Sequence, residues 1–188
     1  MRELIKHNLD NARLGPHYIP LATSVRLYLP DRRNCRRCLF TFNTAKIYDM
    51  IDRHNPEEIR QILKKTKTIA VIGCSPKEER PSHRVARYLL EVGYRVIPVN
   101  PGHEEILGQH CYPSLLDVPE DVDIADIFRR SEEVEPIVLQ ALEKGCETIW
   151  MQQGIINHLA AEIARQRGKK VIMDRCIKVD HANLIANA

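Results

Sequence analysis

Residues 68–84 read TIAVIGCSPKEERPSHR, and this stretch decides the fold of the chain. The continuous apolar run that ends at Ile72 predicts a buried parallel strand, and Gly73 with the Ser-Pro pair after it predicts a sharp turn. The next periodic segment predicts a helix that begins near Ser82. A strand, a turn of small residues and a helix in this order place free backbone N–H groups around an anion. We therefore expect this loop to hold the phosphates of a nucleotide-like cofactor.

Downstream of this stretch, strand-like and helix-like segments alternate. β-Branched apolar segments predict strands at residues 94–99, 122–128, 148–151 and 170–173, with a short edge strand at 108–114. Amphipathic segments predict helices at 85–92, 131–142 and 157–164, and a brief helix at 114–117. Strands that alternate with such helices form βαβ units. We predict an α/β fold with a doubly wound, mostly parallel sheet of five or six strands and helices on both faces.

In a doubly wound sheet, ligands bind beyond the carboxyl ends of the strands, where the strand order reverses. Functional residues should therefore follow the predicted strands. The segments in question are residues 73–76, 100–103, 129–131, 152–154 and 174–176.

The chain divides into two predicted parts. Residues 1–43 form a basic N-terminal extension, which we expect to be irregular or disordered because prolines interrupt it and no period is sustained. Residues 44–188 form the globular domain, which begins with helices within 44–66. The first 66 residues hold 13 Lys and Arg against 7 Asp and Glu, whereas the rest of the chain holds 15 against 18. The slightly acidic body argues against a nucleic-acid-binding core.

Cys35 and Cys38 form a C-x-x-C pair in the extension. Such a pair can be half of a zinc site or a redox pair, but no second half follows and His54 is the one nearby additional ligand. We therefore favour two cysteines in a flexible basic arm, and predict no metal. An extension that is not part of the mature protein is a further alternative.

The remaining composition indicates a cytoplasmic protein. The six cysteines are scattered, which favours reduced thiols over a disulfide framework. No secretory segment precedes the domain, and no apolar run is long enough to cross a bilayer. We expect no membrane association.

The residues around the predicted loop help to choose the cofactor. A dinucleotide-binding protein should carry G-x-G-x-x-G after the first strand and an acid at the end of the second. This chain has a lone Gly73 and Asn100 at those positions, which disfavours NAD. Arg80 and Arg84 follow the first predicted strand, and Arg129 and Arg130 follow the strand at 122–128. Two such groups of positive charge suit a ligand with several phosphates.

Six segments carry a family resemblance. They read VIGCSP (71–76), RPSHRV (80–85), GYRVIPVNP (93–101), DIFRRSE (126–132), WMQQGI (150–155) and DRCI (174–177). Together they resemble the small bacterial and archaeal CoA-binding proteins, which are similar to the CoA-binding domain of the succinyl-CoA synthetase α subunit. The resemblance covers about residues 56–180 and implies a Rossmann-like fold with coenzyme A as ligand. Cys74 stands where many relatives have a small or aliphatic residue, which would add a thiol beside the ligand.

The resemblance also implies which residues meet the ligand. Residues 73–76 would contact the nucleotide and its phosphates, 100–103 would line the adenosine side, and 128–131 with 152–154 would border the pantetheine. The full predicted set is Gly73, Cys74, Ser75, Pro76, Arg80, His83, Arg84, Asn100, Pro101, Gly102, His103, Phe128, Arg129, Arg130, Ser131, Met151, Gln152, Gln153 and Gly154.

No triad or metal motif stands out in the sequence, so we favour a protein that binds CoA or an acyl-CoA without catalysis. One alternative is a cysteine-centred redox or acyl/CoA-transfer protein that uses Cys176 or Cys74, since positive charge near a thiol favours the thiolate. The other is an NAD(P)-binding sensor, which Asn100 disfavours. The sequence is also compatible with a homodimer.

Overall fold

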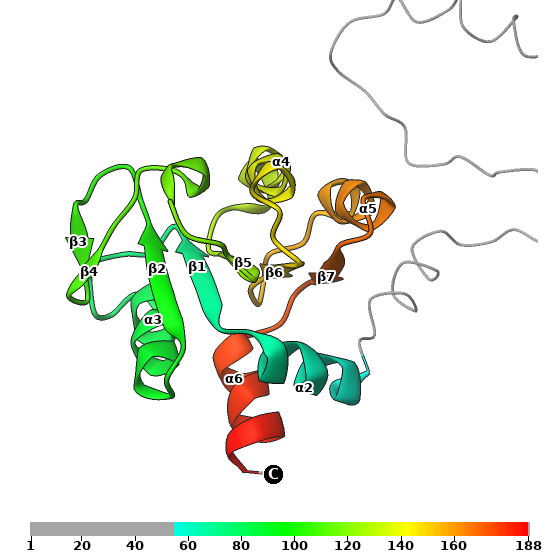
Figure 1. The fold of residues 1–188 in the computed structure, drawn as a ribbon, viewed down its shortest axis with the longest axis horizontal. Helices are drawn as coiled ribbons and strands as arrows, with labels where there is room; N and C mark the ends of the chain where they lie inside the picture. Colours follow the sequence, from blue (N-terminus) through cyan, green and yellow to red (C-terminus); the bar gives the residue numbers. More distant parts are fainter. Residues whose placement is uncertain (1–54, 188) are drawn as a thin grey trace, which may run out of the picture. The chain divides into compact units, whose positions relative to one another are not determined.

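The structure is a computed structural model that describes residues 55–187. Its centre is a five-stranded sheet in the order β2-β1-β5-β6-β7, and every neighbouring pair of strands is parallel (Figure 1). The predicted extension, the Cys35/Cys38 pair and the helix expected from residue 44 lie outside the described residues. The strands are β1 (Thr68–Ile72), β2 (Arg95–Val99), β5 (Ile124–Ile127), β6 (Thr148–Met151) and β7 (Lys170–Ile172).

The strand order confirms the predicted doubly wound α/β fold. The chain forms β1, places β2 on one side of it, and then crosses to the other side to form β5, β6 and β7 in sequence. The order therefore reverses between β1 and β5, and the ends of these two strands border the crevice in which doubly wound sheets bind ligands. Most strand residues are buried, as expected for a sheet covered on both faces.

Helices cover both faces of the sheet (Figure 1). On one face, apolar side chains of α4 (Val134–Lys144) and α5 (His158–Gln166) pack against the sheet. On the other face, α2 (Pro56–Lys65), α3 (Pro81–Glu91) and α6 (Ile177–His181) pack around the buried Trp150. Trp150 belongs to this core, and its indole N–H donates to the Arg175 carbonyl at 2.7 Å.

Local capping residues begin and end several of the helices. Asn55 caps α2 by accepting a hydrogen bond from the Glu57 N–H at 3.0 Å, and Asn157 caps α5 through the Ala160 N–H at 2.9 Å. Gly145 ends α4 in the left-handed conformation. Residues 131–133 form a 3₁₀ turn before α4, so the regular helix begins three residues later than the sequence predicts.

The edge of the sheet differs from the prediction. The segment 108–114 does not form one strand: β3 (Glu105–Ile106) and β4 (Gln109–His110) make a small antiparallel hairpin, and Tyr112 alone bridges Val99. The expected helix at 114–117 is a 3₁₀ turn, η2 (Leu115–Asp117), with a capping box from Ser114.

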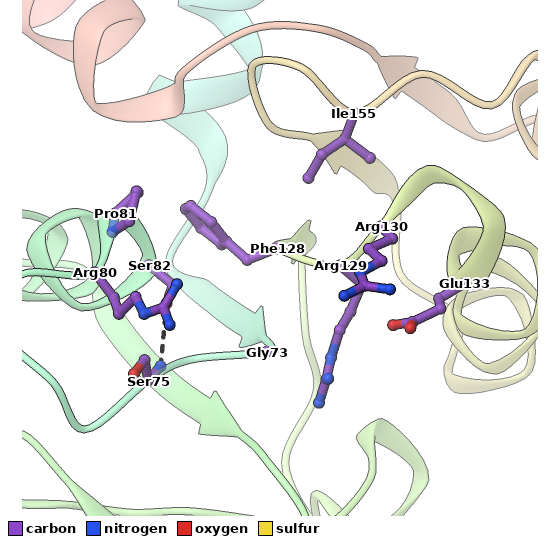
Figure 2. A pocket seen from close by; sticks show the side chains of 10 residues that line it. All are labelled: Gly73, Ser75, Arg80, Pro81, Ser82, Phe128, Arg129, Arg130, Glu133 and Ile155. Atoms are coloured by element: carbon purple, nitrogen blue, oxygen red, sulfur yellow. Dashed lines mark hydrogen bonds between the residues drawn. The ribbon is translucent and has the colours of Figure 1, made fainter.

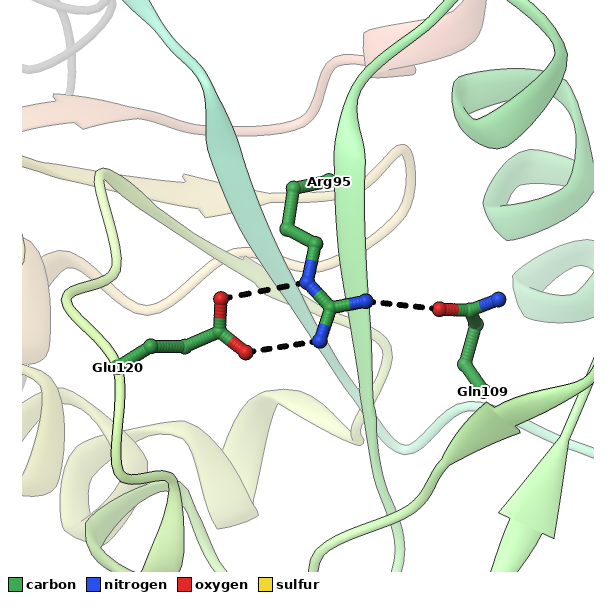
Figure 3. A network of polar contacts seen from close by, with 3 residues as sticks. All are labelled: Arg95, Gln109 and Glu120. Atoms are coloured by element: carbon green, nitrogen blue, oxygen red, sulfur yellow. Dashed lines mark hydrogen bonds and ion pairs between the residues drawn. The ribbon is translucent and has the colours of Figure 1, made fainter.

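A network of side-chain hydrogen bonds links the β3–β4 hairpin to the start of β2 (Figure 3). Arg95 at the start of β2 donates two hydrogen bonds to Glu120, at 2.8 and 3.2 Å, and one to the Gln109 amide oxygen at 2.8 Å. The bidentate pair raises the pKa of Arg95 and lowers that of Glu120. Because both side chains are partly exposed, the network fixes geometry more than it adds stability.

The C-terminal helix is not predicted from the sequence. After β7, α6 and the π-helical turn Ala182–Ala186 (η4) return across the face that carries α2 and α3. His181 is the buried polar centre of this contact: its Nδ1 lies 2.9 Å from the Tyr88 hydroxyl, and its ring meets Tyr88 and Tyr94 edge to face. Burial lowers the pKa of His181 below its ordinary 6.5.

We expect this histidine to make the domain acid-sensitive. Because the unfolded chain binds a proton at His181 more readily than the folded chain, the free energy of unfolding should fall as the pH drops below about 6.5. His181→Phe, which keeps an aromatic ring, should reduce this pH dependence in urea titrations at pH 7 and pH 5. The matched variant His103→Gln, on an exposed loop, should retain it. Equal pH dependence in the His181 variant and the parent would contradict this role.

Candidate ligand-binding cleft

A cleft of about 680 Å³ opens where the strand order reverses. Its walls come from the β1–α3 segment on one side and from the β5–α4 segment on the other, and the two groups of side chains face each other across it (Figure 2). The volume lies within the range of small-molecule sites. The lining residues are Gly73, Ser75, Arg80, Pro81, Ser82, Phe128, Arg129, Arg130, Glu133 and Ile155.

Gly73 allows the two walls to approach. Its φ is +83°, a conformation that side chains disfavour, and its N–H donates to the Val99 carbonyl at 2.8 Å. A Cβ atom at this position would lie 2.5 Å from the Phe128 carbonyl oxygen, which is backbone and cannot rotate away. Glycine is therefore needed both for the turn and for the close contact between the ends of β1 and β5.

Local hydrogen bonds fix the conformation of the loop after Gly73. The Ser75 N–H donates to the Ser82 hydroxyl at 3.1 Å, and the Ser75 hydroxyl accepts from the Lys77 N–H at 3.2 Å. The Nδ1 of His83 lies 3.0 Å from the Ser75 carbonyl oxygen. These bonds tie the loop to the first turn of α3, which starts at Pro81 without a side-chain cap and without an acidic residue. The N-terminus of α3 at this edge of the cleft therefore carries the positive end of its helix dipole without a side-chain cap or an acid in its first turn.

Asn100 braces the same loop from β2. Its amide nitrogen donates to the Cys74 carbonyl at 2.8 Å, and its amide oxygen accepts from the Gly102 N–H at 3.1 Å. Both ends of the amide are used within the protein. An acid at this position could not donate to Cys74, which explains in physical terms why asparagine suits this loop better than the carboxylate of a dinucleotide-binding site.

The charge of the cleft is mainly positive. Arg80 at the start of α3 and Arg129 and Arg130 after β5 line it, and Glu133 supplies one negative charge. Arg129 is half-buried, and its guanidinium lies against Gly73. Arginines on opposite walls can hold phosphate oxygens bidentately, and the uncapped helix end adds to the same potential.

The structure brings together six of the residues predicted to meet a ligand: Gly73, Ser75, Arg80, Phe128, Arg129 and Arg130 line the cleft. Others have structural partners. Met151 is in the core, His83 bonds the loop, and the Ser131 hydroxyl accepts from the Ile156 N–H at 3.1 Å. Ligand contacts remain predictions for the predicted residues outside the lining: Cys74, Pro76, His83, Arg84, Asn100, Pro101, Gly102, His103, Ser131, Met151, Gln152, Gln153 and Gly154.

The two cysteines considered for chemistry do not line the cleft. The Cys74 thiol is fully buried, and burial, with smaller effects of Cys111 and Asp126, raises its pKa to about 12. The Cys74 side chain packs in the core and its carbonyl accepts from Asn100, so contact between its thiol and a ligand stays a prediction of the resemblance. Cys176 is half-buried and precedes the first turn of α6.

Four lining residues were not predicted: Pro81, Ser82, Glu133 and Ile155. Pro81 and Ser82 belong to a quoted motif, but only the fold shows that they face the cleft. Glu133 lies near the start of the helix predicted at 131–142, and in the structure it is the N-cap residue of α4. Ile155 lies in the loop after β6, and its position in the cleft depends on tertiary structure that the local sequence does not determine.

Comparison with known proteins agrees with this geometry. The profile of the family described as CoA binding domain matches residues 67–182, which include both walls of the cleft. The chain belongs to this family. The predicted resemblance is thereby confirmed. Among the described residues 55–187, no helix is long and apolar enough to cross a membrane, and no group of three His, Cys, Asp or Glu side chains could hold a metal ion.

Relatives of two kinds share the domain. The uncharacterised protein YneT of Bacillus subtilis is 42% identical over 125 residues, which cover 66% of this chain and 93% of YneT. An ADP-forming acetate–CoA ligase of Archaeoglobus fulgidus is 31% identical over 132 residues, but the match covers only 19% of that enzyme. A hypothetical protein from Pyrococcus horikoshii has a similar solved structure, with a TM-score of 0.70 and 41% identity over 72% of this chain and 95% of that one.

The close contact at Gly73 predicts a specific cost of substitution. Gly73→Ala should lower the free energy of unfolding by about 2–4 kcal/mol, because positive φ and a clash with backbone add together. Gly93→Ala is the matched control: its φ is +95°, but a Cβ there meets no atom within 4 Å, so only about 1–2 kcal/mol should be lost. Urea unfolding measures both. Equal losses would contradict the close approach of the two strand ends.

Proposed function

We propose that this protein binds coenzyme A or an acyl-CoA in the cleft between the ends of β1 and β5. The observation that carries the proposal is the convergence of the Gly73 loop, an uncapped helix start and arginines from both walls at the reversal of strand order. Membership of the CoA binding domain family supports the choice of CoA among phosphate-bearing ligands.

The cleft residues suit the parts of this ligand. The phosphates would lie between the Gly73 loop and Arg80 on one wall and Arg129 and Arg130 on the other, where backbone and guanidinium donors meet. Phe128 and Ile155 give the cleft apolar surface, which suits the less polar pantetheine arm.

We further propose that binding is not coupled to catalysis by this domain. A thiol with a pKa of about 12 stays protonated at neutral pH and is a poor nucleophile, which disfavours chemistry at Cys74. Cys176 does not line the cleft. The ligase activity of the acetate–CoA ligases is not proposed here, because the matched segment is about a fifth of the Archaeoglobus enzyme. A cytoplasmic location and a homodimer remain predictions of the sequence.

Ligand binding tests the proposal directly. Isothermal titration of the purified full chain should show saturable binding of CoA and acetyl-CoA, and both ligands should raise the melting temperature. NAD and NADP serve as controls that share the nucleotide part, and they should bind much more weakly. Binding of NAD without binding of CoA would overturn the proposal, and release of free CoA from acetyl-CoA would overturn its non-catalytic part.

Arg129 should be a main phosphate contact. Arg129→Ala should weaken CoA binding roughly tenfold or more, because a charge-assisted hydrogen bond is lost from a half-buried position. Arg167→Ala removes the same charge from an exposed site at the end of α5, outside the cleft, and should leave the affinity unchanged. Circular dichroism and melting temperature confirm that both variants fold. Unchanged affinity in the Arg129 variant would remove this residue from the site.

Glu133 should oppose an anionic ligand. Glu133→Gln keeps the size of the side chain and removes its charge, so CoA should bind roughly two- to fivefold more tightly, a modest effect because the side chain is exposed. Glu132→Gln, one residue earlier and outside the lining, is the control. Weaker binding in the Glu133 variant would show that the carboxylate contacts the ligand favourably, against our assignment.

A further inference from the structure

Asp126 is a buried acid in β5, the strand that leads into one wall of the proposed CoA cleft. It lies in β5 between Val71 of β1 and Trp150 of β6, both fully buried, and has no exposed surface itself. Its Oδ1 accepts a hydrogen bond from the Gln152 side chain at 2.7 Å, while its Oδ2 has no partner among the described residues. A buried polar atom without a partner is costly and calls for an explanation.

The position of Asp126 links it to the cleft in two ways. It precedes the lining residue Phe128 by two residues, about 7 Å along an extended strand. Its partner Gln152 begins the loop after β6: the Gln152 carbonyl accepts from the Ile155 N–H at 2.9 Å, and Ile155 lines the cleft. The Asp126–Gln152 hydrogen bond thus links β5 to the loop after β6, and the segments that follow these two strands both contribute residues to the cleft.

The charge state of Asp126 matters to an anionic ligand. A buried carboxylate near the cleft would oppose the potential of Arg129 and Arg130, and salt screens buried charges poorly. A neutral carboxyl does not have this effect. Burial, partly offset by the Gln152 hydrogen bond, raises the pKa of Asp126 to about 8, so the carboxyl is mostly neutral at pH 7.

The other ionisable groups on the sheet face that α2, α3 and α6 cover do not account for the same change of charge. Cys74 and Cys111 have raised pKa values, Arg175 pairs with Asp180, and the lowered pKa of His181 leaves it neutral at pH 7 and above. The further ionisable side chains that pack among the elements of this face include those of Arg60, His83, Tyr88, Tyr94, Cys176 and Lys178.

We propose that Asp126 is a proton-linked positioning residue: through Gln152 it sets the loop that carries Ile155, and only its neutral form is compatible with the phosphate-bearing ligand. Ligand binding then draws a proton from the solvent onto Asp126 as the pH rises. This inference rests on the proposed CoA site and adds a pH dependence to it.

The test is CoA affinity as a function of pH. If only the protonated form binds and Asp126 titrates near pH 8, affinity should fall about tenfold between pH 7 and pH 9. Asp126→Asn, which mimics the neutral acid and cannot ionise, should lose this decline in affinity between pH 7 and pH 9. Asp121→Asn makes the same change at an exposed site and should keep the parent profile. The ligand's own titration is common to all three proteins and cancels in the comparison.

A second variant keeps the test decisive if Asp126→Asn does not fold. The Gln152 hydrogen bond lowers the pKa of Asp126, so Gln152→Met should move the midpoint of the affinity decline to higher pH. Binding of CoA with the same pH profile in the parent and the Asp126 variant, or no shift in the Gln152 variant, would overturn this inference alone. Absence of CoA binding at every pH would overturn the proposed function, and this inference with it.

Discussion

The approach of Gly73 to the Phe128 carbonyl is the contact on which the rest of the site depends. A side chain at residue 73 would meet that oxygen at 2.5 Å, so the ends of β1 and β5 can lie together only because residue 73 has none. This contact sits at the reversal of strand order, where the chain leaves one strand for α3 and the other for α4. It brings the start of α3 and the arginines after β5 to opposite walls of one cleft.

Around this contact, several polar side chains that the sequence predicts to meet a ligand form hydrogen bonds within the protein. Asn100 holds the Cys74 carbonyl, and Ser131 accepts from the loop after β6. The Gln152 side-chain amide donates a hydrogen bond to Asp126. These bonds fix the backbone at the ends of β1, β2, β5 and β6, and such rigidity reduces the entropy that a binding site loses when it is occupied.

Local signals predicted most of the fold, because apolar runs, helix caps and closing glycines act over a few residues. Asn55, Asn157 and Gly145 cap helices through such local contacts, and the order of elements predicts the doubly wound sheet. The C-terminal helix was missed because its stability comes from long-range packing of His181 against Tyr88 and Tyr94. In the site, charge and position after strands identified the arginines. Sequence could not tell which polar residues would be used internally, since those partners lie up to 26 residues away.

Backbone amide shifts on titration with CoA would test the central claim most directly. In heteronuclear NMR spectra of the full chain, the account predicts that the largest changes fall on two segments, residues 73–82 and 128–133, which form the two walls of the cleft. The chemical shifts of amides at the amino-terminal ends of the strands, such as those of Glu147 and Lys170, should not change. Saturable shift changes centred on those amino-terminal ends, with the Gly73 and Arg129 amide shifts unchanged, would contradict the account.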